Sequence, residues 1–134
     1  MSIKPSIKPI SFLKHAIHYK RWGLDNGIGE VWIVNNELYC LKKLTLATGK
    51  KFSSHYHWIK DETWYVVQGQ LTMKYFDLKT ATEIEKTLNP GDIINIPPGN
   101  PHQLTAILDS VIYEVSTPHE DSDSYRIAKG DSQN

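Results

Sequence analysis

The sequence predicts an all-β domain, either a sandwich of two sheets or a small barrel, and three observations support this fold class. First, seven short runs are rich in β-branched and aromatic residues. These runs are residues 30–34, 37–46, 62–68, 70–76, 92–96, 102–107 and 110–116. Second, turn-forming residues separate them, as in the segment PPGNP at 97–101. Third, no segment keeps the apolar period of a helix over about a dozen positions.

The first 20 residues are predicted to form an extended arm. The tetrapeptide SIKP occurs at 2–5 and again at 6–9, and prolines so close together oppose both a helix and a central strand. The arm is expected either to be mobile or to lie along a partner subunit. The β-barrel or sandwich domain is then predicted to span residues 21–118.

The first two predicted strands, 30–34 and 37–46, carry residues expected to face the core. Trp32 is expected to cover the core, as is Trp22 just before these strands. Cys40 is the single cysteine, so it has no partner for an intrachain disulfide, and we interpret it as a small buried residue.

In the middle of the chain, Gly69 marks the boundary between the predicted strands 62–68 and 70–76. Trp64 shares strand parity with Glu62, so both side chains are expected to face the interior. Residues 80–88 are expected to be a further strand or a loop.

The last strands, 92–96, 102–107 and 110–116, flank the proline-rich turn and complete the domain. Residues 119–134 are polar and lack a hydrophobic period, so they are interpreted as a loosely held tail.

Composition excludes several classes of function. The 134 residues fit one domain, and 40% hydrophobic with 22% charged residues are typical of a globular protein. Lys+Arg and Asp+Glu are 15 each, which provides no general attraction for nucleic acid or for an anionic membrane. The N-terminus lacks the apolar stretch of a signal peptide, and no run is long enough to span a membrane, so a cytoplasmic protein is expected.

The stretch HYHWIKDE at 55–62 predicts a metal site. In a strand, His55 and His57 point to the same face, and the four residues that follow are enough to bring Glu62 back beside them. Two imidazoles and a carboxylate form a ligand set typical of zinc or of iron, manganese, nickel or cobalt. His102 is a fourth candidate, because the rigid turn before it determines where its side chain points.

These residues lie in two motifs that resemble those of the cupin superfamily, in particular the small single-domain type 2 cupins. Residues 49–69 match the first motif at every spacing: glycine, His-x-His, glutamate and glycine. Residues 91–102 match the second: glycine, Pro-x-Gly and histidine. Ala106 stands where the second motif often has asparagine. The resemblance implies a cupin-type β-barrel, also called a double-stranded β-helix or jelly roll, with one divalent metal ion held by His55, His57, Glu62 and His102.

The chain is also similar to the cupin domain of type II phosphomannose isomerases. The shared segments are Arg21-Trp22-Gly23, residues 44–49, residues 62–69, residues 96–102, Glu114-Val115-Ser116, Asp123 and Arg126. That group commonly has glutamine at the position of His55 and arginine at that of Lys60. The resemblance implies a sugar or sugar-phosphate substrate and an isomerase or epimerase activity. A homodimer is expected, since small cupins often dimerise.

In this interpretation Arg126 and Lys60 hold a phosphate or stabilise charge during catalysis. The proton carrier stays open among Tyr65, Tyr75, Tyr113, Glu114 and His119. Trp58 is expected at the pocket mouth or at a subunit contact, and the histidines outside the motifs, His15, His18 and His119, are interpreted as surface residues.

Two other functions compete with the isomerase. Three histidines and one glutamate also suit an Fe(II)-dependent dioxygenase, because open positions on such a site accept O₂. A non-enzymatic sugar-binding protein is the third possibility.

Overall fold

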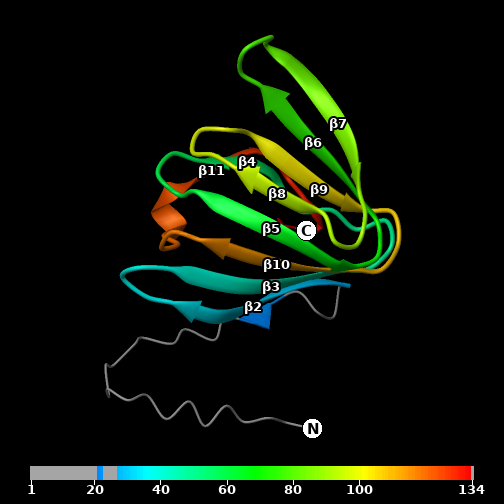
Figure 1. Ribbon diagram of the computed structural model, residues 1–134, viewed down its shortest axis with the longest axis horizontal. Helices are drawn as coiled ribbons and strands as arrows, with labels where there is room; N and C mark the ends of the chain where they lie inside the picture. Colours follow the sequence, from blue (N-terminus) through cyan, green and yellow to red (C-terminus); the bar gives the residue numbers. More distant parts are fainter. Residues whose placement is uncertain (1–20, 23–26, 134) are drawn as a thin grey trace, which may run out of the picture.

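Eleven strands form two antiparallel sheets in the computed structural model, which describes residues 21–22 and 27–133 (Figure 1). In sheet order, the first sheet contains β1 (Arg21–Trp22), β2 (Ile28–Asn35), β3 (Cys40–Leu46), β10 (Ser110–Ser116), β5 (Glu62–Gln68) and β8 (Ile93–Ile96). The second contains β11 (Ser124–Ala128), β4 (Ser54–His57), β9 (His102–Ala106), β6 (Leu71–Asp77) and β7 (Thr82–Leu88). The predicted all-β jelly-roll fold is therefore confirmed.

Short 3₁₀ turns are the only helical elements in the described part of the chain: η2 (Asp121–Asp123) and η3 (Asp131–Gln133). In the described residues, no helix is long and apolar enough to cross a membrane. The arm predicted for residues 1–20, with His15 and His18, lies outside the described residues. The homodimer and the limits of the domain at 21 and 118 stay predictions.

The core lies between the two sheets and is built by strand alternation. Along β3 every second residue is buried, which places Cys40, Leu44 and Leu46 on the inner face. Trp32 is also buried, so the predicted inner positions of Trp32 and Cys40 are confirmed. The segment 80–88 contains the strand β7, which pairs with β6 over its full length.

The inner faces change from apolar to polar along the strands. Leu44 and Leu46 follow Lys42 on β3, and Val66 follows Glu62 and Trp64 on β5. On β9 the polar inner residue is His102, and on β10 the charged inner residue is Glu114, with Ser110 and Ser116 also buried. Antiparallel pairing places these polar ends together, since Glu114 is registered with both Lys42 and Trp64. One end of the jelly roll is therefore packed hydrocarbon, and the other end is a buried polar chamber.

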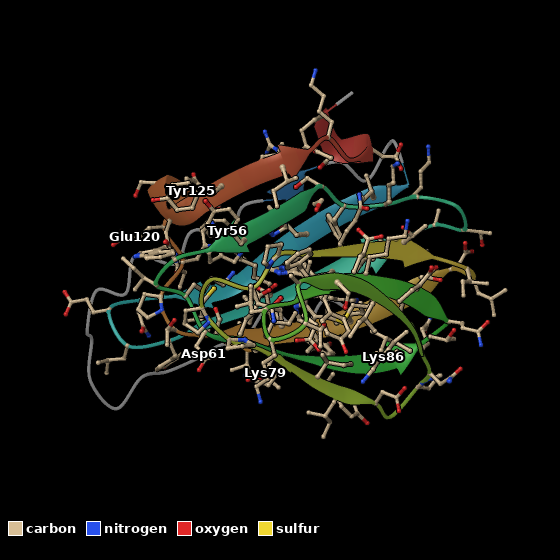
Figure 2. All side chains as sticks on the ribbon, turned by 90° about the horizontal axis from the view of Figure 1, so that it is seen from above. Tyr56, Asp61, Lys79, Lys86, Glu120 and Tyr125 are labelled. Atoms are coloured by element: carbon tan, nitrogen blue, oxygen red, sulfur yellow. The ribbon has the colours of Figure 1, made fainter. Side chains whose placement is uncertain are left out.

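The predicted loosely held tail is wrong for residues 124–128. They form β11, which pairs with β4 so that Tyr125 lies opposite Tyr56 (Figure 2). The same register puts Arg126 opposite His55. All five residues of β11 are exposed, because it is the edge strand of its sheet. An edge strand with no buried face leaves no alternation in the sequence, so a periodicity search has nothing to detect.

Candidate functional site

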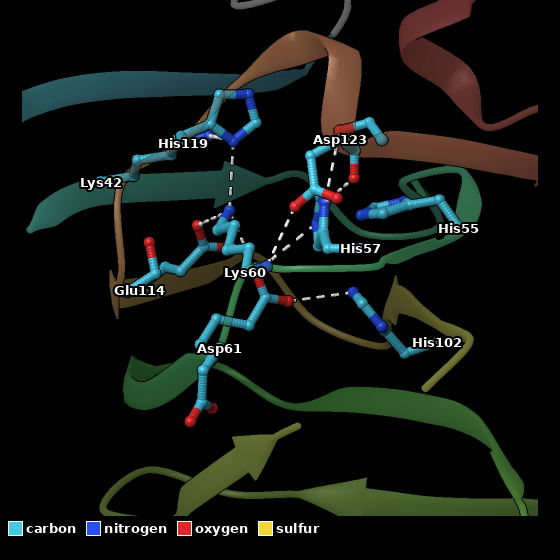
Figure 3. Close-up of polar contacts among 12 residues, drawn as sticks. Lys42, His55, His57, Lys60, Asp61, His102, Glu114, His119 and Asp123 are labelled. Carbon is cyan, nitrogen blue, oxygen red and sulfur yellow. Dashed lines mark hydrogen bonds and ion pairs between the residues drawn. The ribbon is translucent and has the colours of Figure 1, made fainter. Parts of the chain in front are cut away.

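Three histidines from two adjacent strands and a glutamate from the other sheet meet in the polar chamber (Figure 3). His55 and His57 point inward from β4, and His102 is the residue on β9 paired with His55. Glu62 is the first residue of β5. The four residues between β4 and β5 reverse the chain as the sequence predicts, and they bring Glu62 back to His57.

The distances define a compact group. One ring nitrogen from each of His55, His57 and His102 lies within 4.8 Å of the others. Glu62 Oε1 lies 3.0 Å from His102 Nε2, and Glu62 Oε2 lies 3.7 Å from His57 Nε2. The structure thus brings together all four residues singled out from the sequence.

The same atoms are poorly satisfied by the protein itself. Both carboxylate oxygens of Glu62 and the Nε2 of His102 are buried and make no hydrogen bond of good geometry, although Glu62 lies within ion-pair distance of His102 and of Lys60. Buried polar atoms are normally paired, because leaving one unpaired costs about 1–3 kcal/mol. A cation among these atoms would satisfy them all, so the residues fit a divalent metal ion.

The outer nitrogens of the three rings are held in one tautomer. Each Nδ1 faces a backbone carbonyl: that of Ser53 at 3.0 Å for His55, Asp123 at 3.1 Å for His57, and Asn100 at 2.8 Å for His102. A carbonyl oxygen only accepts, so each Nδ1 carries the hydrogen and donates it. In the neutral form of each ring, Nε2 then presents a lone pair to the centre, which is the arrangement that metal-binding histidines require.

The surroundings of His55 and His57 lower their pKa values and so favour the neutral rings that can bind a cation. Burial, and then the neighbouring rings of His102 and His57, lower the pKa of His55 to about 3. Burial likewise lowers the pKa of His57. For His102, burial opposes the charged form, but the adjacent Glu62 carboxylate outweighs it and raises the pKa. In the metal-free protein, the charged forms of His102 and Glu62 therefore stabilise each other.

A second cluster adjoins the four residues, centred on Lys60. Its ammonium lies 2.8 Å from Glu114 Oε2 and 3.1 Å from Glu62 Oε2, and Lys60 is 2% exposed. Burial alone would lower the pKa of Lys60, but the two carboxylates outweigh burial and raise it. Trp64 Nε1 donates to the other oxygen of Glu114 at 3.2 Å. Lys60 is thus an ion-paired buried residue that orients two carboxylates.

His119 joins this cluster, contrary to its interpretation as a surface residue. Its Nδ1 lies 3.2 Å from Lys42 Nζ and 3.3 Å from Lys60 Nζ, and its Nε2 lies 3.0 Å from Asp121 Oδ1. Ammonium groups only donate, so Nδ1 accepts and Nε2 carries the hydrogen. Lys42 is itself buried, 3.5 Å from Glu30 and over the Trp32 ring. Neither Lys42 nor His119 lies in a sequence motif that indicates a site. The alternation along β3 is the one signal that would have predicted an inward-facing Lys42.

These groups line one cavity of about 490 Å³. Its wall includes His55, His57, Glu62, His102, Lys42, Lys60, Glu114, His119 and Arg126. Arg126 is exposed at the wall, and within the described part of the chain its side chain makes no ion pair or hydrogen bond. Of the proton-carrier candidates, Glu114 and His119 line the cavity, whereas Tyr65, Tyr75 and Tyr113 do not. Trp58 is 69% exposed and also lies outside the lining.

The buried His119 predicts acid sensitivity of the metal-free protein. Burial, followed by the charges of Lys42 and Lys60, lowers the pKa of His119 to about 4. The unfolded chain takes up a proton near pH 6.5, and the folded protein does so only near pH 4. Stability from His119 is therefore complete above about pH 6.5 and falls by about 3 kcal/mol as the pH drops to 4.

Urea denaturation of the metal-free protein between pH 7.5 and 4.5 measures this loss. We expect His119→Gln to reduce the difference in unfolding free energy between the two pH values by about 2 kcal/mol or more. An identical pH dependence in wild type and His119→Gln contradicts the assignment.

Comparison with known proteins agrees with this geometry. The family model described as "Cupin domain" matches residues 42–115. No curated protein matches the sequence. KdgF from Halomonas sp. has a similar solved structure, with a TM-score of 0.65 and 21% sequence identity over 77% of this chain and 89% of that chain.

Two larger proteins contain a similar domain. CapF, the capsular polysaccharide assembling protein of Staphylococcus aureus, gives a TM-score of 0.70 and 17% identity over 84% of this chain. A variant of oxalate decarboxylase from Bacillus subtilis gives 0.68 and 19% over 75% of this chain. The matched regions are 33% of the CapF chain and 28% of the oxalate decarboxylase chain. At these identities the likeness is one of fold.

Proposed function

This chain belongs to the cupin domain family, and from that premise we propose that it is a metal-dependent isomerase or epimerase of a sugar or sugar phosphate. The observation that carries the proposal is the convergence of three imidazole nitrogens and the buried Glu62 carboxylate in one cavity, whose wall also contains Glu114 and His119. The similarity to the cupin domain of type II phosphomannose isomerases supports the choice of substrate class.

In this proposal His55, His57, Glu62 and His102 hold one divalent ion. Imidazole and carboxylate ligands accept zinc, iron, manganese, nickel or cobalt. When bound, the ion supplies positive charge that stabilises negative charge developing on the sugar oxygens. The fixed Nδ1–H tautomers of the three rings orient the ligands before the ion arrives, which lowers the cost of binding.

The protein must also move a proton between adjacent carbons of the sugar. Glu114 and His119 are the two candidates on the cavity wall that are not themselves proposed ligands. Glu114 is a carboxylate held in one orientation by Lys60 and Trp64, and His119 is a neutral imidazole. We assign the proton transfer to Glu114, because its partners fix its position beside Glu62 through the shared Lys60 ammonium.

The two cations predicted as catalytic have different roles in the proposal. The Lys60 ammonium is already neutralised by two carboxylates, so it positions Glu62 and Glu114. Arg126 lies exposed at the wall and offers a guanidinium for an anionic group of the substrate. A sugar phosphate would thus place its sugar oxygens near His55 and its phosphate toward β11.

Exchange of substrate hydrogen with solvent tests the isomerase. The protein loaded with manganese, cobalt or zinc is incubated without oxygen with mannose 6-phosphate or fructose 6-phosphate in D₂O. We expect deuterium to enter the carbon next to the carbonyl, and Glu114→Gln to lower the rate by about 10²–10⁴-fold. Arg126→Ala is expected to raise KM, whereas Lys129→Ala on the same segment leaves KM unchanged.

The other outcomes separate the competing functions. Absence of exchange with every metal and both sugars contradicts the sugar-phosphate isomerase. Oxygen uptake by the iron-loaded protein, lost under anaerobic conditions, favours the dioxygenase. Saccharide binding without turnover favours a non-enzymatic sugar-binding protein.

A further inference from the structure

We propose that Asp123 is the positioning residue of the metal centre, so that the segment after β10 controls how tightly the protein binds its ion. The proposal rests on the metal site assigned above and concerns a residue that is not one of the four ligands. Asp123 is the last residue of η2, is 6% exposed, and lies next to β11.

The carboxylate of Asp123 is the anchor of the loop that separates His57 from Glu62. Its Oδ1 accepts hydrogen bonds from the backbone N–H groups of Trp58 at 2.9 Å and Ile59 at 3.1 Å. Its Oδ2 accepts from Ile59 at 3.2 Å and Lys60 at 3.0 Å. Three consecutive N–H groups therefore converge on one buried anion, an arrangement in which the backbone dipoles stabilise negative charge (Figure 3).

The main chain of Asp123 contacts the site as well. Its carbonyl accepts the hydrogen from His57 Nδ1 at 3.1 Å, which sets the ring orientation and the tautomer. Asp123 thus contacts the ring of His57 directly and also binds the backbone of the three residues that follow His57. Because Lys60 is the last of these, Asp123 also determines where the Lys60 ammonium meets Glu62 at 3.1 Å.

Apolar packing contributes little to holding this loop, whose one buried side chain is the ion-paired Lys60. Trp58 and Ile59 are 69% and 71% exposed, so their apolar side chains do not anchor it in the core. The other backbone contacts of the loop lie at its ends: Gly99 N–H donates to the His57 carbonyl, and Asp61 bonds Thr117. The backbone of Trp58 and Ile59 therefore depends on the Asp123 carboxylate for its position.

Asp123→Asn is the variant that tests the proposal. The asparagine amide has one acceptor oxygen, whereas both oxygens of the Asp123 carboxylate accept hydrogen bonds. In either orientation of the amide, its NH₂ group would face a backbone N–H that donates to Asp123 in the wild type. Residues that orient metal ligands typically change affinity by about 10–100-fold when replaced, and we expect a loss of that size for cobalt and zinc. Competition with a fluorescent chelator measures the affinity, and the visible absorption of bound cobalt reports the ligand geometry.

Asp131→Asn is the matched control. Asp131 also lies in the C-terminal segment and also accepts a backbone hydrogen bond, but from Lys51 at 2.7 Å rather than from the ligand loop. We expect its cobalt spectrum and metal affinity to equal those of wild type. Asp123→Glu, which keeps the carboxylate, is expected to bind metal more tightly than Asp123→Asn, and the melting temperature of each metal-free variant separates general unfolding from the local effect.

The results distinguish this proposal from the one it depends on. Failure of the wild-type protein to bind any divalent metal overturns the metal centre itself. Wild-type binding combined with an unchanged affinity and cobalt spectrum in Asp123→Asn overturns the positioning role alone. An equal loss in Asp131→Asn also overturns it, because the effect would then follow from loosening the C-terminal segment.

Discussion

Replacing His102 with alanine is expected to lower the affinity for a divalent metal by about 100-fold or more. Four-ligand sites bind zinc with an apparent free energy of about 10–16 kcal/mol, so one ligand in four accounts for about 3 kcal/mol. His102 is 3% exposed and 3.0 Å from Glu62, so its loss also leaves that carboxylate without its histidine partner. Chelator competition and the metal content of the purified variant measure the effect.

His119→Asn is the control for this experiment. His119 lines the same cavity and is the described histidine that does not belong to the three-ring group. It is expected to keep the metal affinity of the wild type. His55→Ala is the second ligand variant, because His55 is only half-buried and its removal disturbs packing less. Wild-type affinity in both ligand variants would remove these rings from the metal site.

Replacing Lys60 with methionine is expected to destabilise the metal-free protein by about 3–5 kcal/mol. Methionine keeps the apolar stem but removes the ammonium, so Glu62 and Glu114 are left buried without their cation. The destabilisation is expected to shrink as the pH falls, since the Lys60 charge lowers the pKa of Glu62 and protonating Glu62 removes its uncompensated charge. Urea denaturation at pH 7.5 and pH 5 measures both effects.

A second substitution shows whether the unpaired carboxylate charge causes the loss of stability in Lys60→Met. In the background of Lys60→Met, Glu114→Gln removes one unpaired carboxylate and is expected to recover part of the lost stability. Bound metal is also expected to reduce the cost of Lys60→Met, because it provides a new cation for Glu62. A Lys60→Met protein as stable as the wild type at pH 7.5 would show that the ammonium does not hold the two carboxylates.

The four residues proposed as metal ligands could be singled out from the sequence because their signal is local. Strand parity aims His55 and His57 at one face, and the four residues before Glu62 are the length of a tight reversal. The rigid turn before His102 adds a second motif with its own spacing. These constraints act over a few residues, so they can be recognised without any long-range contact.

The second layer of the chamber was not predictable in the same way. Lysine side chains are mostly exposed to solvent, so the sequence alone favours a surface position for Lys42 and Lys60. Burial of both depends on Glu30, Glu62 and Glu114, which come from other strands. Likewise, β11 has no buried face, and only its pairing with β4 makes it part of the sheet.

The sequence by itself determined the all-β class, most of the strands and the four residues that converge, because alternation and turn chemistry operate between near neighbours. Only the tertiary structure decided that Lys60, Glu114 and His119 share the chamber and that Asp123 anchors the ligand loop. Those contacts join residues 54 to 65 positions apart, and the cost of burying each charge is met only when the folded chain brings its partner within hydrogen-bonding distance.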